Sequence, residues 1–376
     1  MKIAILFGNY SVGNRPFDFH YDNIWTCLRG LTGSDLAVVV ISRELAKLRH
    51  NISLFTVHAE PQNKPIVWEG VKLFNYIDHH TVIDDSFDAV ISINEPDAFR
   101  GVNTKGLKIC WEFLNDFTFC QDGFEEFVDL WLSPCQMHME HLKTQTSQPE
   151  KWGVLPLGCE PSWYSDKRIP GRVVWTSSCD RGLHWLLSCW PEIKKAVPYA
   201  TLKIFYHFDY GNILNMEPND DNHHPHVKEM GQRLRYCKNA ITKMKDLGVE
   251  QVGSVSRVDI AEELSKASVF GFSADTVAFT EGFSVSALES HASFTVPVLT
   301  DCDCLGSIYK DSGCVMINGP IREHLPEFTT AVIKGLTDKE FADKTIEKCM
   351  NFAVNYTWPG IAKQMENFIK THNKNQ

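Results

Sequence analysis

The chain has 376 residues, of which 43% are hydrophobic and 22% are charged, and its formal net charge is −10 at pH 7. This composition is typical of a globular protein and excludes a mainly disordered chain, while the length favours two domains over one. The acidic balance argues against a nucleic-acid partner, because phosphate backbones are bound by basic surfaces.

The twelve cysteines contain no CxxC pair, and Cys302 and Cys304 are the one closely spaced pair. That spacing suits neither a zinc knuckle nor a redox motif. The histidine tract 223–226 is expected to be a solvated loop, because Pro225 breaks the helical spacing that two metal ligands would need. The first residues form an apolar strand rather than a signal peptide, and no apolar run is long enough to span a membrane. We therefore expect reduced thiols, a cytoplasmic location and at most peripheral membrane contact.

In the first half of the chain, short apolar runs alternate with helical or turn segments. A glycine turn, 30–35, is expected to open a helix over Leu36–Leu48 with Ser34 as its N-cap. This alternation predicts a parallel sheet with crossover helices. The expected strands are Ile3–Phe7, Ile52–Val57, Val71–Tyr76, Ala89–Ile93, Leu107–Trp111 and Leu130–Ser133.

The stretch Leu155–Gly171 is rich in proline and glycine and has no periodicity, which indicates a linker between domains. The alternation then restarts with a helix over Gly182–Val197, and a final amphipathic helix is expected over Trp358–Lys370. The expected strands are Arg172–Ser177, Leu202–Tyr206, Val252–Ser254, Val269–Phe272, Val296–Leu299 and Val315–Ile317. We therefore predict an α/β protein with two doubly wound, Rossmann-like domains, 1–165 and 166–354, facing each other across a ligand-binding cleft.

The segment Thr280–Glu289 carries two glutamates eight positions apart, with a Gly-Phe turn directly after the first. It predicts a loop with Glu281 at its tip and a helix that contains Glu289. The amides of Gly282, Phe283 and Ser284 would favour an anion at the start of this helix. Two interpretations remain open: a nucleotide-sugar site, or two glutamates on a solvated helix face.

Arg181 lies between an expected strand and an expected helix, where its guanidinium could grip a diphosphate. The alternative is a surface arginine paired with Asp180. The turn that contains Gly33 could let the backbone approach a phosphate, or could simply cap a helix.

Several polar residues follow strands of the first domain and could supply a general acid or base for an acceptor. They are Glu95, Asp97, Glu112, Asn115 and Asp116.

Together these motifs resemble the retaining glycosyltransferases of family 4, which have the two-domain GT-B architecture. The resemblance covers nearly the whole chain. It is carried by the glycine turn with its following helix, by the segment 180–200 that begins Asp-Arg-Gly-Leu, and by an E-x7-E signature from Glu281 to Glu289.

The resemblance implies a role for each matching residue. Glu281 would contact hydroxyls of the donor sugar, Glu289 would accept from the ribose hydroxyls, and Arg181 would replace the lysine that usually binds the diphosphate. The amides of 282–284 would hold the phosphates, and Gly33 would approach the sugar or phosphate. The C-terminal segment, 355–376, would cross back to the first domain.

Two departures from the family pattern stand out. The family usually has a second basic residue shortly before the lysine that binds the diphosphate. Ser177 and Ser178 occupy that region in this chain, and Ser178 is expected to contact the donor. The family commonly has a histidine directly after a strand of the first domain. The segment 112–116 that follows Trp111 contains none, so Asn115 or Asp116 would assist the acceptor.

The function that we expect is transfer of a sugar, with retention, from a UDP- or GDP-sugar to a hydroxyl of a glycan, lipid-linked or protein-linked acceptor. Ser254 and Val255 are expected to line the base pocket. No cofactor or metal is expected, because helix dipole and Arg181 would stabilise the leaving diphosphate and the Asp301-Cys-Asp303 pair lies beyond the signature. The alternatives are a nucleotide-sugar epimerase or hydrolase of the same fold, and a non-catalytic nucleotide-sugar-binding protein.

Overall fold

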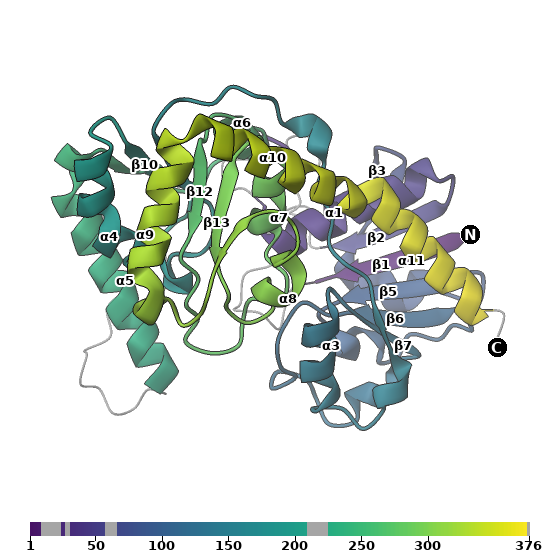
Figure 1. The fold of residues 1–376 in the computed structure, drawn as a ribbon. Helices are drawn as coiled ribbons and strands as arrows, with labels where there is room; N and C mark the ends of the chain where they lie inside the picture. The colour runs from purple at the N-terminus through teal and green to yellow at the C-terminus, as the bar shows by residue number, and fades with distance from the viewer. Residues whose placement is uncertain (9–23, 27–30, 57–65, 209–224, 374–376) are drawn as a thin grey trace. The chain divides into compact units, whose positions relative to one another are not determined.

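A computed structural model of the protein describes residues 1–8, 24–26, 31–56, 66–208 and 225–373. The chain forms two compact α/β units (Figure 1). Unit 1 comprises Met1–Ile24, Leu31–Gly158 and Tyr356–Gln376, and unit 2 comprises Trp25–Gly30 and Cys159–Asn355. Apart from the short segment 25–30, the main chain passes from unit 1 to unit 2 at 158–159 and returns at 355–356, whereas the sequence places the first boundary at 165–166.

Unit 1 is built on an eight-stranded sheet in the order β3-β4-β2-β1-β5-β6-β7-β8. All neighbouring strands are parallel except β3, which runs antiparallel to β4. The strands are β1 (Lys2–Phe7), β2 (Asn51–Thr56), β3 (Ile66–Trp68), β4 (Val71–Asn75), β5 (Ala89–Ile93), β6 (Leu107–Trp111), β7 (Leu130–Ser133) and β8 (Trp152–Val154).

The helices of unit 1 are α1 (Gly33–Lys47), α2 (His79–Val82), α3 (Gln136–Lys143) and α11 (Trp358–Asn373). Helix α11 packs against α1, so the last helix of the chain belongs to the same unit as the first strand (Figure 1). The N-cap of α1 is Thr32, and the prediction of Ser34 is wrong. The Thr32 side chain accepts from the Asp35 amide while the Asp35 carboxylate accepts from the Thr32 amide, and this reciprocal capping box satisfies two helix-end donors.

Unit 2 is built on a six-stranded parallel sheet in the order β11-β10-β9-β12-β13-β14. The strands are β9 (Arg172–Trp175), β10 (Thr201–Ile204), β11 (Val249–Gln251), β12 (Val269–Phe272), β13 (Val296–Thr300) and β14 (Val315–Ile317). The helices are α4 (Leu183–Ala196), α5 (Pro225–Lys243), α6 (Arg257–Ser265), α7 (Val285–Ala292), α8 (Leu305–Tyr309), α9 (Ile321–Thr337) and α10 (Lys339–Ala353). Helices α4, α5 and α9 lie on one face of the sheet, and α7 with α10 lies on the other (Figure 1).

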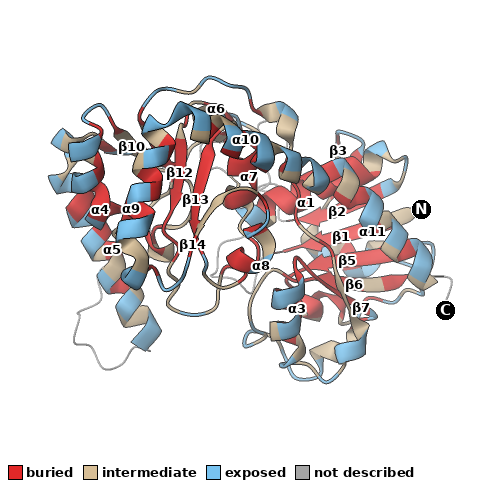
Figure 2. Ribbon diagram, viewed as in Figure 1, coloured by how far each residue is buried: buried red, intermediate tan, exposed pale blue. Residues whose placement is uncertain are grey.

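The central strands of both sheets are buried along their length, as the continuous apolar runs predict for parallel strands covered on both faces (Figure 2). The fold class is therefore confirmed. The predicted strand Val252–Ser254 is wrong, because β11 occupies Val249–Gln251 and Gly253 adopts a positive φ of +87° that ends extended structure.

None of the helices in the described part of the chain is long and apolar enough to cross a membrane. The described cysteines are all free thiols.

Candidate functional site

Arg181 is held at the carboxyl end of β9 by a tight approach of two backbone segments. Gly182 follows it with a φ of +111°, and a Cβ there would lie 2.0 Å from the carbonyl oxygen of Ser273. The Ser273 hydroxyl donates to the Gly182 carbonyl at 2.9 Å, and the amide of Asp275 donates to the Arg181 carbonyl at 3.0 Å. Only glycine fits at 182, so the Asp-Arg-Gly sequence fixes the backbone from which Arg181 projects.

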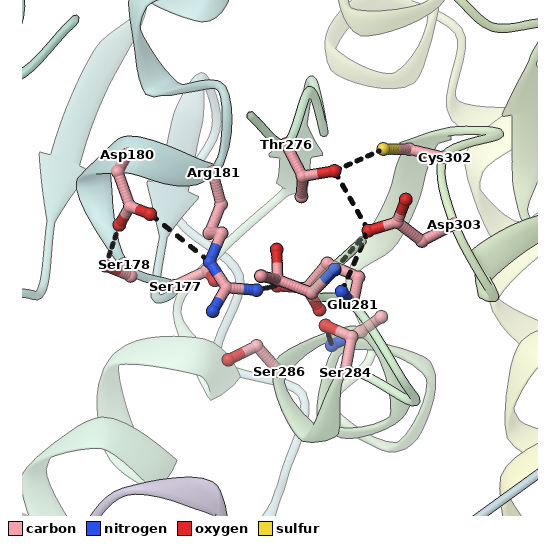
Figure 3. Close-up of polar contacts among 12 residues, drawn as sticks. Ser177, Ser178, Asp180, Arg181, Thr276, Glu281, Ser284, Ser286, Cys302 and Asp303 are labelled. Carbon is pink, nitrogen blue, oxygen red and sulfur yellow. Dashed lines mark hydrogen bonds and ion pairs between the residues drawn. The ribbon is translucent and has the colours of Figure 1, made fainter. Parts of the chain in front are cut away.

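Arg181 and Glu281, one hundred positions apart in the sequence, form an ion pair (Figure 3). The Arg181 Nη1 atom lies 2.8 Å from Glu281 Oε1, and its Nε atom lies 3.4 Å from Asp180 Oδ2. Burial raises the pKa of Glu281; Arg181 opposes this shift, while Asp303 and Asp180 add to it. Burial also works against the charge of Arg181, but Glu281 and Asp180 outweigh it and raise the pKa of the guanidinium. The pair thus combines a permanent cation with a carboxylate that a polar ligand could draw away.

Asp303, which the sequence analysis considered only as part of a metal-type pair, anchors the loop that carries Glu281. Its Oδ2 atom accepts from the amides of Thr280 and Glu281 and from the hydroxyl of Thr276, each at 2.9 Å (Figure 3). The Cys304 amide donates to the Glu281 carbonyl at 3.2 Å. These bonds hold the loop down, and Glu281 is 7% exposed rather than at a loop tip.

Helix α7 starts directly after this loop. Ser284 is its N-cap, with a positive φ of 65°, and its hydroxyl accepts from the Ala287 amide at 3.4 Å. Phe283 is buried, and the Gly282 amide donates to the Thr280 carbonyl at 3.2 Å. The three residues therefore lie at the helix start beside Glu281, and the Gly282 amide is bonded within its own loop.

Glu289 lies inside α7 and is 3% exposed. It forms an ion pair with Arg257, the first residue of α6, which is itself 7% exposed. The Arg257 guanidinium also donates to the Tyr164 hydroxyl at 3.3 Å and lies over the Trp163 ring. Since both signature glutamates are buried and paired with arginines, a solvated helix face is excluded. Arg257 was missed because nothing in the sequence links 257 to 289.

The other residues expected at the donor lie at the same edge of the sheet of unit 2. Ser178 precedes Arg181, and its hydroxyl donates to Asp180 (Figure 3). Ser254 is exposed and Val255 is half-buried, and both follow β11 in the loop that leads to α6.

Unit 1 contains Gly33, which was expected to approach the donor, and the residues expected on the acceptor side. Gly33 is exposed at the first position of α1, and its turn partner Gly30 lies outside the described residues, as do His223 and His224 of the histidine tract. Asn115 is fixed through its carbonyl, which accepts from His141 at 2.9 Å. Asp116 accepts from the amide and hydroxyl of Thr118 and borders a cavity.

Within the described residues, no three His, Cys, Asp or Glu side chains gather in a way that could hold a metal ion. Metal independence remains a prediction.

No known protein-family profile matches the sequence, and comparison with curated proteins finds no match. Solved structures do match along the whole chain. Sucrose-phosphate synthase from Thermosynechococcus elongatus has a TM-score of 0.70 at 11% identity, with all of both chains covered. Anabaena HepE, solved with UDP and glucose, has a TM-score of 0.64 at 12% identity, covering 99% of this chain and all of its own. WaaG, a glycosyltransferase involved in lipopolysaccharide biosynthesis, has a TM-score of 0.60 at 12% identity, covering 98% of this chain and 99% of its own. The chain therefore has the two-domain GT-B fold over its full length.

Proposed function

We propose that the protein transfers a sugar from a nucleoside-diphosphate donor to an acceptor hydroxyl, with retention and without a metal. One observation carries this proposal: the Arg181–Glu281 ion pair at the carboxyl edge of the sheet of unit 2, beside the start of α7. Structural neighbours of the same fold include a protein solved with UDP and glucose, which supports a UDP-sugar as the first donor to test.

In this proposal, the donor exchanges partners with the ion pair. The diphosphate takes the Arg181 guanidinium, whose planar fork suits two phosphate oxygens. Glu281, released from Arg181, then accepts from hydroxyls of the sugar. Asp303 keeps the Glu281 backbone in place during this exchange, because its three hydrogen bonds hold the loop and not the carboxylate.

The reaction balances without a protein nucleophile. The bond between C1 of the donor sugar and the diphosphate oxygen breaks, and a bond from C1 to the acceptor oxygen forms on the same face. The acceptor proton passes to the leaving diphosphate oxygen. Arg181 and the α7 helix dipole stabilise the negative charge that grows there.

The ribose step needs a second exchange. Glu289 would accept from the ribose hydroxyls only after Arg257 shifts from it, since the two side chains form a buried pair. The same sheet edge would also supply contacts for the phosphates and the base, from Ser178, Ser254 and Val255.

The test begins with binding and transfer assays against a panel of UDP- and GDP-sugars, with and without EDTA. We expect one donor to bind and turn over at the same rate with EDTA, and NMR of the product to show the donor's anomeric configuration. Glu281→Ala should lower kcat at least about a hundredfold. Arg181→Met should lower kcat/KM by a similar factor, whereas Arg181→Lys should retain part of it.

The matched control is the Arg172–Glu263 ion pair, which lies 3.4 Å apart at the opposite end of β9. Arg172→Met and Glu263→Gln should leave kcat unchanged. Near-normal turnover by Glu281→Ala would refute the site. Sugar release or interconversion in a donor-only incubation, with no acceptor used, would instead identify a hydrolase or an epimerase.

A further inference from the structure

Unit 1 contains a cavity of about 460 Å³ that the donor chemistry of unit 2 does not use. It lies at the carboxyl edge of the sheet, where Glu95 follows β5 and Glu112 follows the neighbouring strand β6; Tyr76, which follows β4, also lines it. Parallel α/β sheets bind ligands at this edge. Asp97 and Asp116 also line the cavity, so four carboxyl groups surround one space.

The carboxyl groups of the two buried glutamates offer hydrogen-bond acceptors to this space. Glu95 is 8% exposed, and its Oε2 atom accepts from the Tyr76 hydroxyl at 3.0 Å. Glu112 is 1% exposed, and its Oε1 atom accepts from the Leu114 amide at 2.9 Å. The carboxyl oxygens of Glu95 can accept a further hydrogen bond from a ligand. Burial raises the pKa of Glu112 to about 8, so this group keeps its proton at pH 7 and can both accept and donate.

His79 adds an acceptor of a different kind. Burial lowers the pKa of this histidine, so its ring is neutral at pH 7. Its Nδ1 atom lies 2.6 Å from the Tyr76 carbonyl oxygen and therefore carries the proton, which leaves Nε2 as an acceptor. The residue is 3% exposed and lines the cavity, and Nε2 has no hydrogen-bond partner among the residues that the structure describes. An unpaired buried acceptor of this kind is costly and indicates a ligand that donates.

Among the residues that the structure describes, the cavity offers no unpaired lysine or arginine to an anionic ligand. Arg100 is the one lysine or arginine among the described residues that line it. Its guanidinium donates to Asp97 at 2.7 Å and to the carbonyls of Gln121 at 3.3 Å and Asp122 at 2.5 Å. The Cys120 thiol also lines the cavity, and burial raises its pKa to about 12. The four carboxyl groups of the cavity add to that shift, as expected in a negative electrostatic field.

Aromatic surface completes the lining. Phe119 is 67% exposed at the cavity, and Phe117 beside it packs against Phe124 and Trp131. An exposed ring beside clustered acceptors suits the C–H face of a sugar ring whose hydroxyls point at carboxylates.

We propose that this cavity of unit 1 binds the acceptor, and that the acceptor is an uncharged, hydroxyl-rich carbohydrate rather than a phosphorylated or carboxylated one. This rests on the proposed glycosyl transfer. The hydroxyls of the acceptor donate to Glu95 and His79 and exchange hydrogen bonds with the protonated Glu112, and one ring face packs on Phe119. A phosphate would meet carboxyl groups and, among the described residues, no unpaired lysine or arginine, so phosphorylated sugars are disfavoured.

Saturation-transfer NMR on the full-length protein tests this without a donor, with methyl α-glucoside, maltose, glucosamine and glucose 6-phosphate as probes. We expect the two neutral sugars to bind at least tenfold more tightly than glucose 6-phosphate, and glucosamine, whose ammonium the carboxyl groups attract, to bind at least as well as they do. Phe119→Ala, at an exposed position where folding is not at risk, should weaken the neutral sugars about fivefold. Glu95→Gln should weaken them about tenfold. The control Glu140→Gln, on the exposed face of α3, should change nothing.

Preferred binding of glucose 6-phosphate over the neutral sugars, no saturable binding of either neutral sugar, or affinities unchanged in both variants would each overturn the inference. Donor binding is measured separately. A protein that turns over a nucleotide-sugar but prefers a phosphorylated acceptor would contradict this inference and leave the proposed function standing, whereas absence of any donor binding would contradict the proposed function.

Discussion

Replacing Glu112 by glutamine should change how the stability of unit 1 depends on pH. Glu112 is 1% exposed at the end of β6, and burial raises its pKa from 4.5 to about 8. Its Oε1 atom accepts from the Leu114 amide, and a glutamine side chain can accept in the same way. The substitution therefore keeps the shape and the hydrogen bond but removes the titration.

The size and sign of the effect follow from the pKa shift. Between pH 4.5 and 8 the folded protein keeps a proton on Glu112 that the unfolded chain has already released, so the free energy of unfolding falls as pH rises. The slope approaches about 1.4 kcal/mol per pH unit, and across the whole window it amounts to about 5 kcal/mol. That is comparable with the total stability of a typical domain, so the effect should be measurable. Below pH 4.5 the contribution is fully present, and above pH 8 it is fully lost.

Hydrogen exchange read by mass spectrometry on the peptides of β5 and β6 measures this locally, between pH 5 and pH 8 and with intrinsic exchange rates corrected for pH. The wild-type protein should lose protection as pH rises, and Glu112→Gln should lose much less. Glu150→Gln, at an exposed position of the same unit, is the control and should follow the wild type. Equal pH slopes for wild type and Glu112→Gln would show that Glu112 does not titrate in this range, and the electrostatic description of the cavity would need revision.

Three further results are expected. Gly182→Ala should destabilise unit 2 by about 3 kcal/mol, because its Cβ would meet a carbonyl oxygen at 2.0 Å; Gly253→Ala, also at positive φ but with open space around it, should cost only about 1 kcal/mol in urea unfolding. Arg257→Met should destabilise unit 2 by about 3–5 kcal/mol, because it leaves Glu289 buried without a counter-charge. Adding Glu289→Gln should recover most of this loss, and full additivity of the two substitutions in the double-mutant cycle would contradict the pairing. Anionic iodoacetate should alkylate Cys120 at least tenfold more slowly than neutral iodoacetamide after correction for intrinsic reactivity, because the carboxyl groups of the cavity repel it. High salt should reduce the ratio of the two alkylation rates, and a ratio that does not respond to salt would argue against a negative field in the cavity.

The architecture could be predicted because parallel strands leave a clear trace in the sequence. Apolar runs such as Ala89–Ile93 and Leu107–Trp111 have the same bounds in the structure as in the prediction, since burial on both faces makes the whole strand hydrophobic. The three-residue strands β3 and β8 were missed, whereas β14, which is equally short, was predicted with its observed bounds.

The candidate site could be predicted only in part, for a different reason. Arg181 and Glu281 were each selected from their local setting, but their ion pair joins segments one hundred positions apart, and no local pattern encodes it. The same holds for Arg257 beside Glu289 and for Asp303 under the loop of Glu281. Pairings of this kind depend on the order of strands in the sheet, which periodicity does not specify.

The return of the main chain from unit 2 to unit 1 at 355–356 has a consequence for synthesis on the ribosome. Unit 2 is almost entirely contained within 159–355, whereas unit 1 needs α11 from the end of the chain. Helix α1, buried from Asp35 to Leu45, contacts α11 and must wait for all of unit 2 to be translated before this partner emerges. The unit whose sheet is translated first is thus the one that finishes folding last, and its apolar surface stays uncovered for the longest time in the cell.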